Sequence, residues 1–144
     1  MIGFSAKEPF ELLIPVRPDD IDELNHVSNI VYVRWIQDAA VAHWFGQASE
    51  EHKEKIAWLV ARHEIDYKRS AGPNDTIIAR TWVGKAIQNF FERHTEMFRQ
   101  SDMKMLAKAR SLWRPVDKET LKPIHVGPEI YEQWSVSQGE IQSE

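Results

Sequence analysis

Five segments of the chain carry the alternation of apolar and polar residues, or the short apolar run, that predicts β-strands. They are residues 10–16, 56–68, 76–87, 90–99 and 103–113. The first, FELLIPV, contains a proline, which favours an edge strand or a bulge because proline cannot donate to a sheet hydrogen bond. Short polar links separate the later segments and predict hairpins. We therefore expect one strand followed, after a break, by four strands in a meander.

The break between the first two strands contains a pattern of helical period. Apolar residues recur there at spacings of three and four, at Ile30, Val33, Ile36, Ala40 and Trp44. Such spacing places them on one face of an α-helix. Ser28 or Asn29 is a suitable N-cap and Gly46 a suitable end. Because further apolar residues extend around the circumference, we expect the helix to be enclosed rather than to lie on a surface.

One long apolar helix among consecutive strands predicts an α+β fold in two layers. We expect a curved antiparallel sheet wrapped around one long central helix, which is the hot-dog fold. The segment GPEIYEQW, residues 127–134, adds a short helix near the end of the chain. No repeat or linker divides the sequence, and 144 residues suit a single domain over residues 1–144.

Composition narrows the classes of function. The 18 basic and 22 acidic residues give a net charge of −4, which argues against nucleic acid as a partner. The chain has no cysteine, and its histidines lack the spacing of a metal site, so we predict neither a metal nor another cofactor. No signal peptide or membrane-spanning run is recognisable, which predicts a cytoplasmic protein that does not enter a membrane.

Residues that could take part in catalysis lie directly before the predicted helix. The segment DDIDELNH, residues 19–26, places three aspartates, a glutamate and a histidine beside the expected helix N-terminus. Backbone N–H groups there are free to bind a developing negative charge, and a carboxylate or imidazole can move a proton. The alternative is that the acids only cap the helix and complement its dipole. Asp22 is the candidate for chemistry, whereas Asp19 and Asp20 fit solvated loop charges or cap partners.

The segment DIDELNHVSNIVYVRWIQDAA resembles the signature of the hot-dog acyl-CoA thioesterases, particularly the 4-hydroxybenzoyl-CoA thioesterase-like group. The matching positions are Asp20, Asp22, His26, Val27, Asn29 and Tyr32. Asn25 stands where glycine is usual, and Ser28 where asparagine is usual. Later segments, such as EIDYKRSAGPNDTIIARTWV, resemble the strands of the same family. The resemblance covers nearly the whole chain, roughly residues 8–130.

This resemblance implies hydrolysis of a thioester between an acyl group and coenzyme A or an acyl carrier protein. It makes Asp22 the nucleophile or general base, and it assigns the oxyanion contact to the backbone N–H at Asn29. His26 either orients water or substrate or only bonds to the loop backbone. Asp38, within the helix, is a reserve candidate for the catalytic acid. The resemblance also implies a homodimer or homotetramer with active sites at the interface between protomers.

The same resemblance suggests which residues contact substrate. Basic residues for the coenzyme A phosphates are Lys68, Arg69 and Lys85, with Arg93, Lys108 and Arg110 as further candidates. Tyr32 either contacts substrate or packs between helix and sheet. Trp58 and Phe90 are candidates for the acyl pocket.

Two other functions remain open for a chain of this kind. A non-catalytic protein that binds acyl thioesters could keep the fold without the activity. A hot-dog dehydratase or hydratase is less well supported, because the glycine- and proline-rich motif that those enzymes carry near the helix is absent here.

Overall fold

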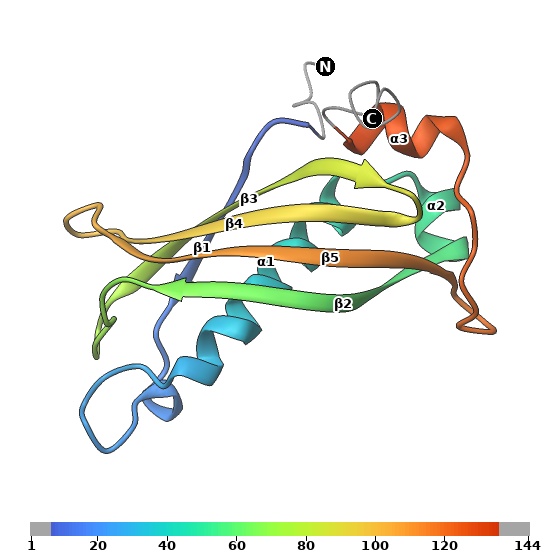
Figure 1. Cartoon of the computed structure of the whole chain (residues 1–144). Helices are drawn as coiled ribbons and strands as arrows, with labels where there is room; N and C mark the ends of the chain where they lie inside the picture. The colour runs from blue at the N-terminus through green and yellow to red at the C-terminus, as the bar shows by residue number, and fades with distance from the viewer. Residues whose placement is uncertain (1–6, 136–144) are drawn as a thin grey trace.

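The computed structural model of the chain describes residues 7–135 and places a long helix, α1 (Asn29–Gln47), against one face of a five-stranded antiparallel sheet (Figure 1). The strands are β1 (Phe10–Pro15), β2 (Ile56–Tyr67), β3 (Thr76–Ile87), β4 (Phe90–Arg99) and β5 (Met105–Asp117). Three short helices complete it: η1 (Pro18–Asp20), α2 (Glu50–Lys55) and α3 (Pro128–Trp134). The predicted α+β architecture, one long helix against an antiparallel sheet, is confirmed.

The strands follow the order β1-β3-β4-β5-β2 across the sheet. The last three strands form the predicted meander, but β2 pairs with β5, from Ile56↔Asp117 to Tyr67↔Ala107, and not with β3. The prediction of four meandering strands was therefore wrong for β2. Residues 68–75 carry the chain from one edge of the sheet to β3, on the far side of β4 and β5. As a result β1 and β2 form the two edges.

Several element boundaries also differ from the predicted ones. β5 continues through Pro115 to Asp117, because its final residues pair with the start of β2. Helix α1 ends one residue beyond Gly46. The charged stretch that follows it is a short helix, α2, in which the Ser49 hydroxyl accepts a hydrogen bond from the His52 amide at 3.1 Å.

Helix α1 buries one side against the sheet and leaves the other side uncovered. Trp35, Ile36 and Ala39 are fully buried in the main core. On the opposite side Ile30, Val41 and Phe45 remain 77%, 50% and 52% exposed. The expectation of an enclosed helix was therefore wrong for the single chain, because one sheet can cover only one side of a helix.

A second apolar cluster lies at the C-terminal end of α1, where α3 packs over the helix and sheet. Its buried members are Trp44, Ile56, Val83, Ala86, Phe91, Ile130 and Trp134. Figure 1 shows the loop that precedes α1 at one end of the sheet and α2 and α3 at the other. The molecule thus has two distinct ends, which carry different groups of side chains.

Candidate active site

The loop before α1 is a tight turn whose backbone positions Asp22. An isolated bridge between Ile21 and Val27 closes the loop, and the Asp22 amide donates to the His26 carbonyl at 2.8 Å. Asn25 has a φ of 63°, in the left-handed region that glycine and asparagine tolerate best. Asparagine therefore serves at the position where the family usually has glycine.

The Asp22 carboxylate is exposed and is only half engaged. Its Oδ1 accepts hydrogen bonds from the amides of Leu24 at 2.9 Å and His26 at 3.4 Å. Its Oδ2 has no hydrogen-bond partner within residues 7–135. One oxygen thus holds the turn, and the other is available to a ligand or a water molecule.

The N-terminus of α1 lies beside this turn and offers open donors. Ser28 is the N-cap, but its side chain makes no capping hydrogen bond. In the described part of the chain, the amides of Asn29 and Ile30 make no hydrogen bond, as expected for the first turn of a helix. The positive end of the helix dipole adds to their attraction for an anion. The Tyr67 hydroxyl donates to the Asn29 carbonyl at 3.2 Å and ties the end of β2 to the same place.

Asp20 is buried, and it fastens the loop to the helix. Its two carboxylate oxygens accept from Nη1 and Nη2 of Arg34 at 2.9 and 3.0 Å, and its carbonyl accepts from the Ser28 amide at 2.9 Å. The hydrogen bond from Arg34 holds the pKa of Asp20 below its usual value, although burial opposes this. Of the two predicted roles, a solvated charge is therefore wrong, whereas Asp20 is a cap partner of η1, because its Oδ2 also accepts from the Arg17 amide at 2.9 Å. Asp38 lies 3.9 Å from Nε of Arg34 and belongs to the same group of charges.

Some residues predicted to contact substrate lie on the surface, and others lie in the core. Lys68 and Arg69 are exposed directly after β2, and both amides donate to the Leu106 carbonyl. Since Tyr67 contacts Asn29, these two cations lie at the same end of the sheet as Asp22. Tyr32 is 1% exposed and its hydroxyl accepts from the Ala71 amide at 3.1 Å, so its place is between helix and sheet.

The remaining basic candidates lie elsewhere. Lys85 is near the β3–β4 hairpin, at the opposite end of the sheet from Asp22. Lys108 is exposed on β5. Arg93 is buried inside the fold, so the suggestion that it binds a coenzyme A phosphate at the surface was wrong. A single chain therefore does not bring Lys85 together with Lys68 and Arg69.

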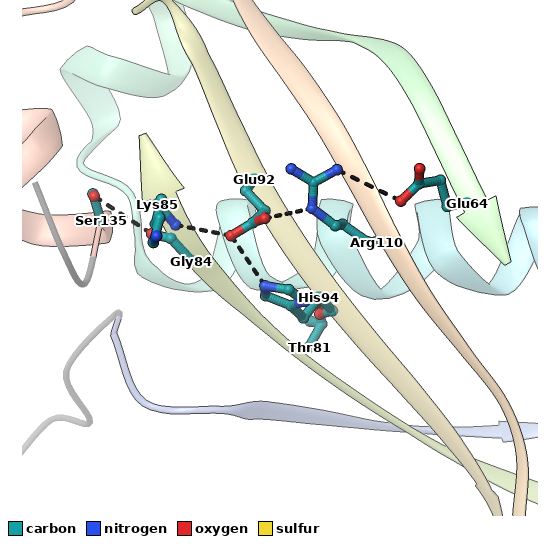
Figure 2. Close-up of polar contacts among 8 residues, drawn as sticks. All are labelled: Glu64, Thr81, Gly84, Lys85, Glu92, His94, Arg110 and Ser135. Carbon is teal, nitrogen blue, oxygen red and sulfur yellow. Dashed lines mark hydrogen bonds and ion pairs between the residues drawn. The ribbon is translucent and has the colours of Figure 1, made fainter. Parts of the chain in front are cut away.

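Arg110 belongs to a charged cluster on the outer face of the sheet (Figure 2). Glu92, 12% exposed, accepts from Nε of Arg110 and from the Lys85 amide, and lies 3.1 Å from Nε2 of His94. Burial acts to raise the pKa of Glu92, but these partners outweigh it and the pKa lies below its usual value. Arg110 also contacts Glu64 at 3.6 Å. Its charge is thus already neutralised by two carboxylates.

A cavity of about 180 Å³ lies at the other end of the molecule, between the C-terminal half of α1 and the sheet. Four tryptophans line it, Trp44, Trp58, Trp113 and Trp134. The predicted pocket residue Trp58 is thus in place. Phe91 lines the cavity where Phe90 was expected, because Phe90 packs beneath the Arg114 guanidinium, 5.1 Å from its ring centre.

The cavity and Asp22 are far apart within one chain. Val41, at the mouth of the cavity, follows Asn29 by twelve positions along α1, which corresponds to about 18 Å of helix. The described residues contain no cluster of three or more His, Asp or Glu side chains that could hold a metal. Nor does this part of the chain contain a helix of the length and apolar character needed to cross a membrane.

Comparison with known proteins places this geometry in a family. Residues 16–134 match the model of the thioesterase-like superfamily. Over 86 residues, 60% of this chain, the sequence is 27% identical to a chloroplastic acyl-[acyl-carrier-protein] hydrolase of Cuphea viscosissima. The chain spans about a fifth of the length of the curated relatives that it matches.

Solved structures share the fold at lower identity. A DHNA-CoA thioesterase from Staphylococcus aureus superposes with a TM-score of 0.76 at 18% identity, covering 94% of this chain and 91% of that chain. A 12:0-ACP thioesterase from Umbellularia californica gives a TM-score of 0.73 at 17% identity, covering 87% of this chain and 49% of that chain. These likenesses confirm the hot-dog fold.

The sequence analysis did not predict three contacts or positions of individual side chains. They are the bond from Tyr67 to Asn29, the ion pair of Asp20 with Arg34, and the burial of Arg93. The first two join residues that no sequence pattern connects. The third was readable, because Arg93 has the same parity along β4 as the buried residues Phe91 and Met97.

Proposed function

The chain belongs to the thioesterase-like superfamily, and on that premise we propose that it hydrolyses acyl thioesters of coenzyme A or an acyl carrier protein. The observation that supports this most directly is the pairing of an exposed carboxylate, half free of hydrogen bonds, with the open amides of a helix N-terminus. A relative named as an acyl-[acyl-carrier-protein] hydrolase and a structure of the same fold named as a DHNA-CoA thioesterase are consistent with it.

In the proposed reaction Asp22 acts through Oδ2. Either Oδ2 removes a proton from water as the water oxygen bonds to the thioester carbon, or Oδ2 itself attacks and water then cleaves the resulting anhydride. The amides of Asn29 and Ile30 hold the carbonyl oxygen as it becomes negative, a contact worth roughly 3 kcal/mol in other acyl-transfer sites. In the first route the C–S bond then breaks, and the thiolate takes up the proton held on Oδ2. In the second route the C–S bond breaks as the anhydride forms, and the thiolate takes up a proton released by the water that later cleaves the anhydride. To His26, an exposed residue of the same turn, we assign the role of orienting the attacking water.

We further propose that two copies associate through β2. In the described chain β2 pairs only with β5, so its outer edge presents unpaired backbone groups over twelve residues. Leu59 and Tyr67 are exposed on this strand, and the exposed α1 residues Val41 and Phe45 extend the apolar surface. A two-fold axis would pair the two β2 strands antiparallel.

Such pairing would complete the site. Tyr67, at one end of β2, marks the position of Asn29 and Asp22, while Ile56 and Trp58, at the other end, line the cavity. Antiparallel pairing places the Tyr67 end of one protomer beside the Ile56 end of its partner. The cavity of one protomer then receives the acyl group of a thioester that lies at Asp22 of the other. We assign the binding of the carrier phosphates to Lys68 and Arg69, which are exposed at the Tyr67 end of β2.

The test is hydrolysis of a panel of acyl-CoA esters, measured by trapping the released thiol with a chromogenic reagent. We expect Asp22→Asn to lower kcat by at least about a hundredfold, since a positioned acid or base typically contributes that much. Asp19→Asn removes an exposed carboxylate three positions away and serves as the matched control, with kcat within about twofold of the parent.

Hydrolysis that survives Asp22→Asn would contradict the assignment of this residue. The hydrogen bonds to Oδ1 of Asp22 would also suit a residue that only stabilises the turn. The alternative function is therefore a non-catalytic protein that binds acyl thioesters. Binding of acyl-CoA or acyl carrier protein without any release of thiol would establish that alternative.

A further inference from the structure

Arg93 is a cation buried in the apolar interior at the cavity wall. It lies on the inward face of β4, is 7% exposed, and is among the residues that line the cavity. Its Nη1 lies 3.0 Å from Nδ1 of His43 and donates to the Thr81 hydroxyl at 3.1 Å. A guanidinium has no acceptor, so Nδ1 of His43 accepts and the ring carries its proton on Nε2. Both neighbours are therefore neutral acceptors, and neither compensates the charge.

No carboxylate within residues 7–135 forms an ion pair with this guanidinium. Burial, without a compensating charge, lowers the pKa of Arg93 to about 10. A buried ion without a counter-ion is unfavourable, and buried charges in folded proteins are normally paired. The Thr81 hydroxyl already donates to the His94 carbonyl at 2.8 Å, so it does not need an arginine for its own hydrogen bonding.

The cavity that Arg93 lines is positively charged and small. Within residues 7–135 its lining includes a second cation, Lys118, and no acid, although the chain as a whole has a charge of −4. The volume of about 180 Å³ is close to that of an engineered protein cavity of roughly 150 Å³ that accommodates benzene. An occupant of about six carbons, aliphatic or a single ring, therefore fits. The remaining surface is aromatic and aliphatic and would contact its carbon skeleton.

We propose that this cavity binds a short acyl group whose far end carries a carboxylate, and that Arg93 is the residue that recognises that carboxylate. The guanidinium offers planar donors that match the two oxygens of a carboxylate. His43 and Thr81 hold one of its nitrogens and so fix its orientation. This proposal rests on the proposed thioester hydrolysis, because that function identifies the ligand as an acyl group. The thioester would lie toward the mouth of the cavity and the carboxylate at Arg93.

Ligand binding can be measured without catalysis, because four tryptophans line the cavity and report its occupancy by their fluorescence. The probes are monomethyl adipate, which has one free carboxylate, and methyl hexanoate, its uncharged counterpart of equal chain length. We expect the parent protein to bind monomethyl adipate at least about tenfold more tightly, as a buried charge-assisted hydrogen bond allows. Equal affinity for the two probes would overturn the proposal whatever the variants do.

Two variants test whether Arg93 causes the preference for monomethyl adipate. Arg93→Met keeps the approximate length of the side chain and removes the charge, so it should abolish the difference between the two probes. Arg80→Met is the matched control, because Arg80 is an exposed arginine on the neighbouring strand β3, and the tenfold preference should survive there. A preference that persists in Arg93→Met, folded as judged by circular dichroism, would contradict the role of Arg93.

The assay of hydrolysis separates this inference from the proposed function. Adipoyl-CoA and hexanoyl-CoA differ only in the terminal carboxylate, and we expect the parent to show the higher kcat/KM for adipoyl-CoA. Failure to hydrolyse either ester, with selective binding of monomethyl adipate retained, would refute the hydrolase and not the site. Hydrolysis of both esters at equal kcat/KM, with equal binding of the two free probes, would refute the site and not the hydrolase.

Discussion

Two aspartates that are two positions apart have opposite environments in this molecule. Asp20 is buried and ion-paired with Arg34, whereas Asp22 is exposed, and its Oδ2 accepts no hydrogen bond from the described residues. The sequence indicated that an acidic turn precedes the helix, and it singled out Asp22. It did not reveal the burial of Asp20, because that depends on Arg34, fourteen residues away, turning back toward the loop. Long-range partners of single residues are the features that a local pattern does not contain.

Asp20→Asn should lower the free energy of unfolding at neutral pH by about 2 kcal/mol, measured by urea denaturation. Breaking a fully buried ion pair costs about 3–5 kcal/mol, and the smaller figure reflects Arg34, whose side chain is 34% exposed. Asp19→Asn, at the exposed neighbouring position, should change the stability by less than about 0.5 kcal/mol. Equal stability of the Asp20→Asn variant and the parent would show that the ion pair contributes nothing net.

The ion pair of Asp20 with Arg34 also predicts how the stability of the protein depends on pH. The pKa of Asp20 in the folded protein lies below the usual value of 3.8, so its contribution is complete above that pH. It is lost as the pH falls through the folded-state pKa and the carboxylate takes up a proton. The stability gap between the parent and Asp20→Asn should therefore be constant near neutrality and narrow below about pH 4. A gap that widens in acid would contradict the lowered pKa.

At the scale of elements, periodicity located the strands well but did not identify their partners. All five strands and the long helix lie within a few residues of their predicted bounds. Alternation shows which residues share a face, and Arg93 alternates in step with the buried Phe91. The prediction of a phosphate contact followed the charge of Arg93 instead of this pattern, and so it missed the burial. Alternation does not state which strand is adjacent, and the pairing of β2 with β5 depends on the connection through residues 68–75.

Packing between β3 and β4 predicts that substitutions at Gly84 and Glu92 have non-additive effects on stability. A Cβ added at Gly84 would lie 2.5 Å from Oε1 of Glu92 and 3.0 Å from Nε2 of His94 (Figure 2). Gly84→Ala must therefore displace the Glu92 carboxylate from Arg110 and His94. In a Glu92→Ala background the same change meets only the His94 ring, 3.0 Å away, whose side chain is 34% exposed and has room to move. The substitution should then stabilise the strand by about 0.5–1 kcal/mol.

The double-mutant cycle, measured by chemical denaturation, should give a coupling of about 1 kcal/mol between Gly84→Ala and Glu92→Ala. Additive effects of the two substitutions would mean that Glu92 moves aside without loss of its hydrogen bonds.

At the scale of the whole molecule, the two sheet edges differ. Edge β2 has twelve residues and edge β1 has six, the last of which is Pro15. We expect the parent protein to sediment as a dimer and Leu59→Lys to raise the dimer dissociation constant at least about tenfold, because a lysine on an edge strand opposes pairing. Leu13→Lys, at a similarly exposed leucine on β1, is the matched control and should remain dimeric.

Hydrolysis should fall together with dimerisation in Leu59→Lys, since the proposed site takes its cavity from one protomer and Asp22 from the other. Full activity of a monomeric Leu59→Lys protein, established by sedimentation in the assay buffer, would contradict the shared site.

The short β1 edge has a consequence for growth of the assembly. A sheet that could extend at both edges would add copy after copy and lengthen into a ribbon. Here Pro15 has no N–H to offer, and the described β1 strand gives a new copy only six residues to align with. The proposed addition through β2 would therefore use the long edge of each copy and stop at two. A protein that presents apolar side chains along an open strand would in this way remain protected from fibrous polymerisation.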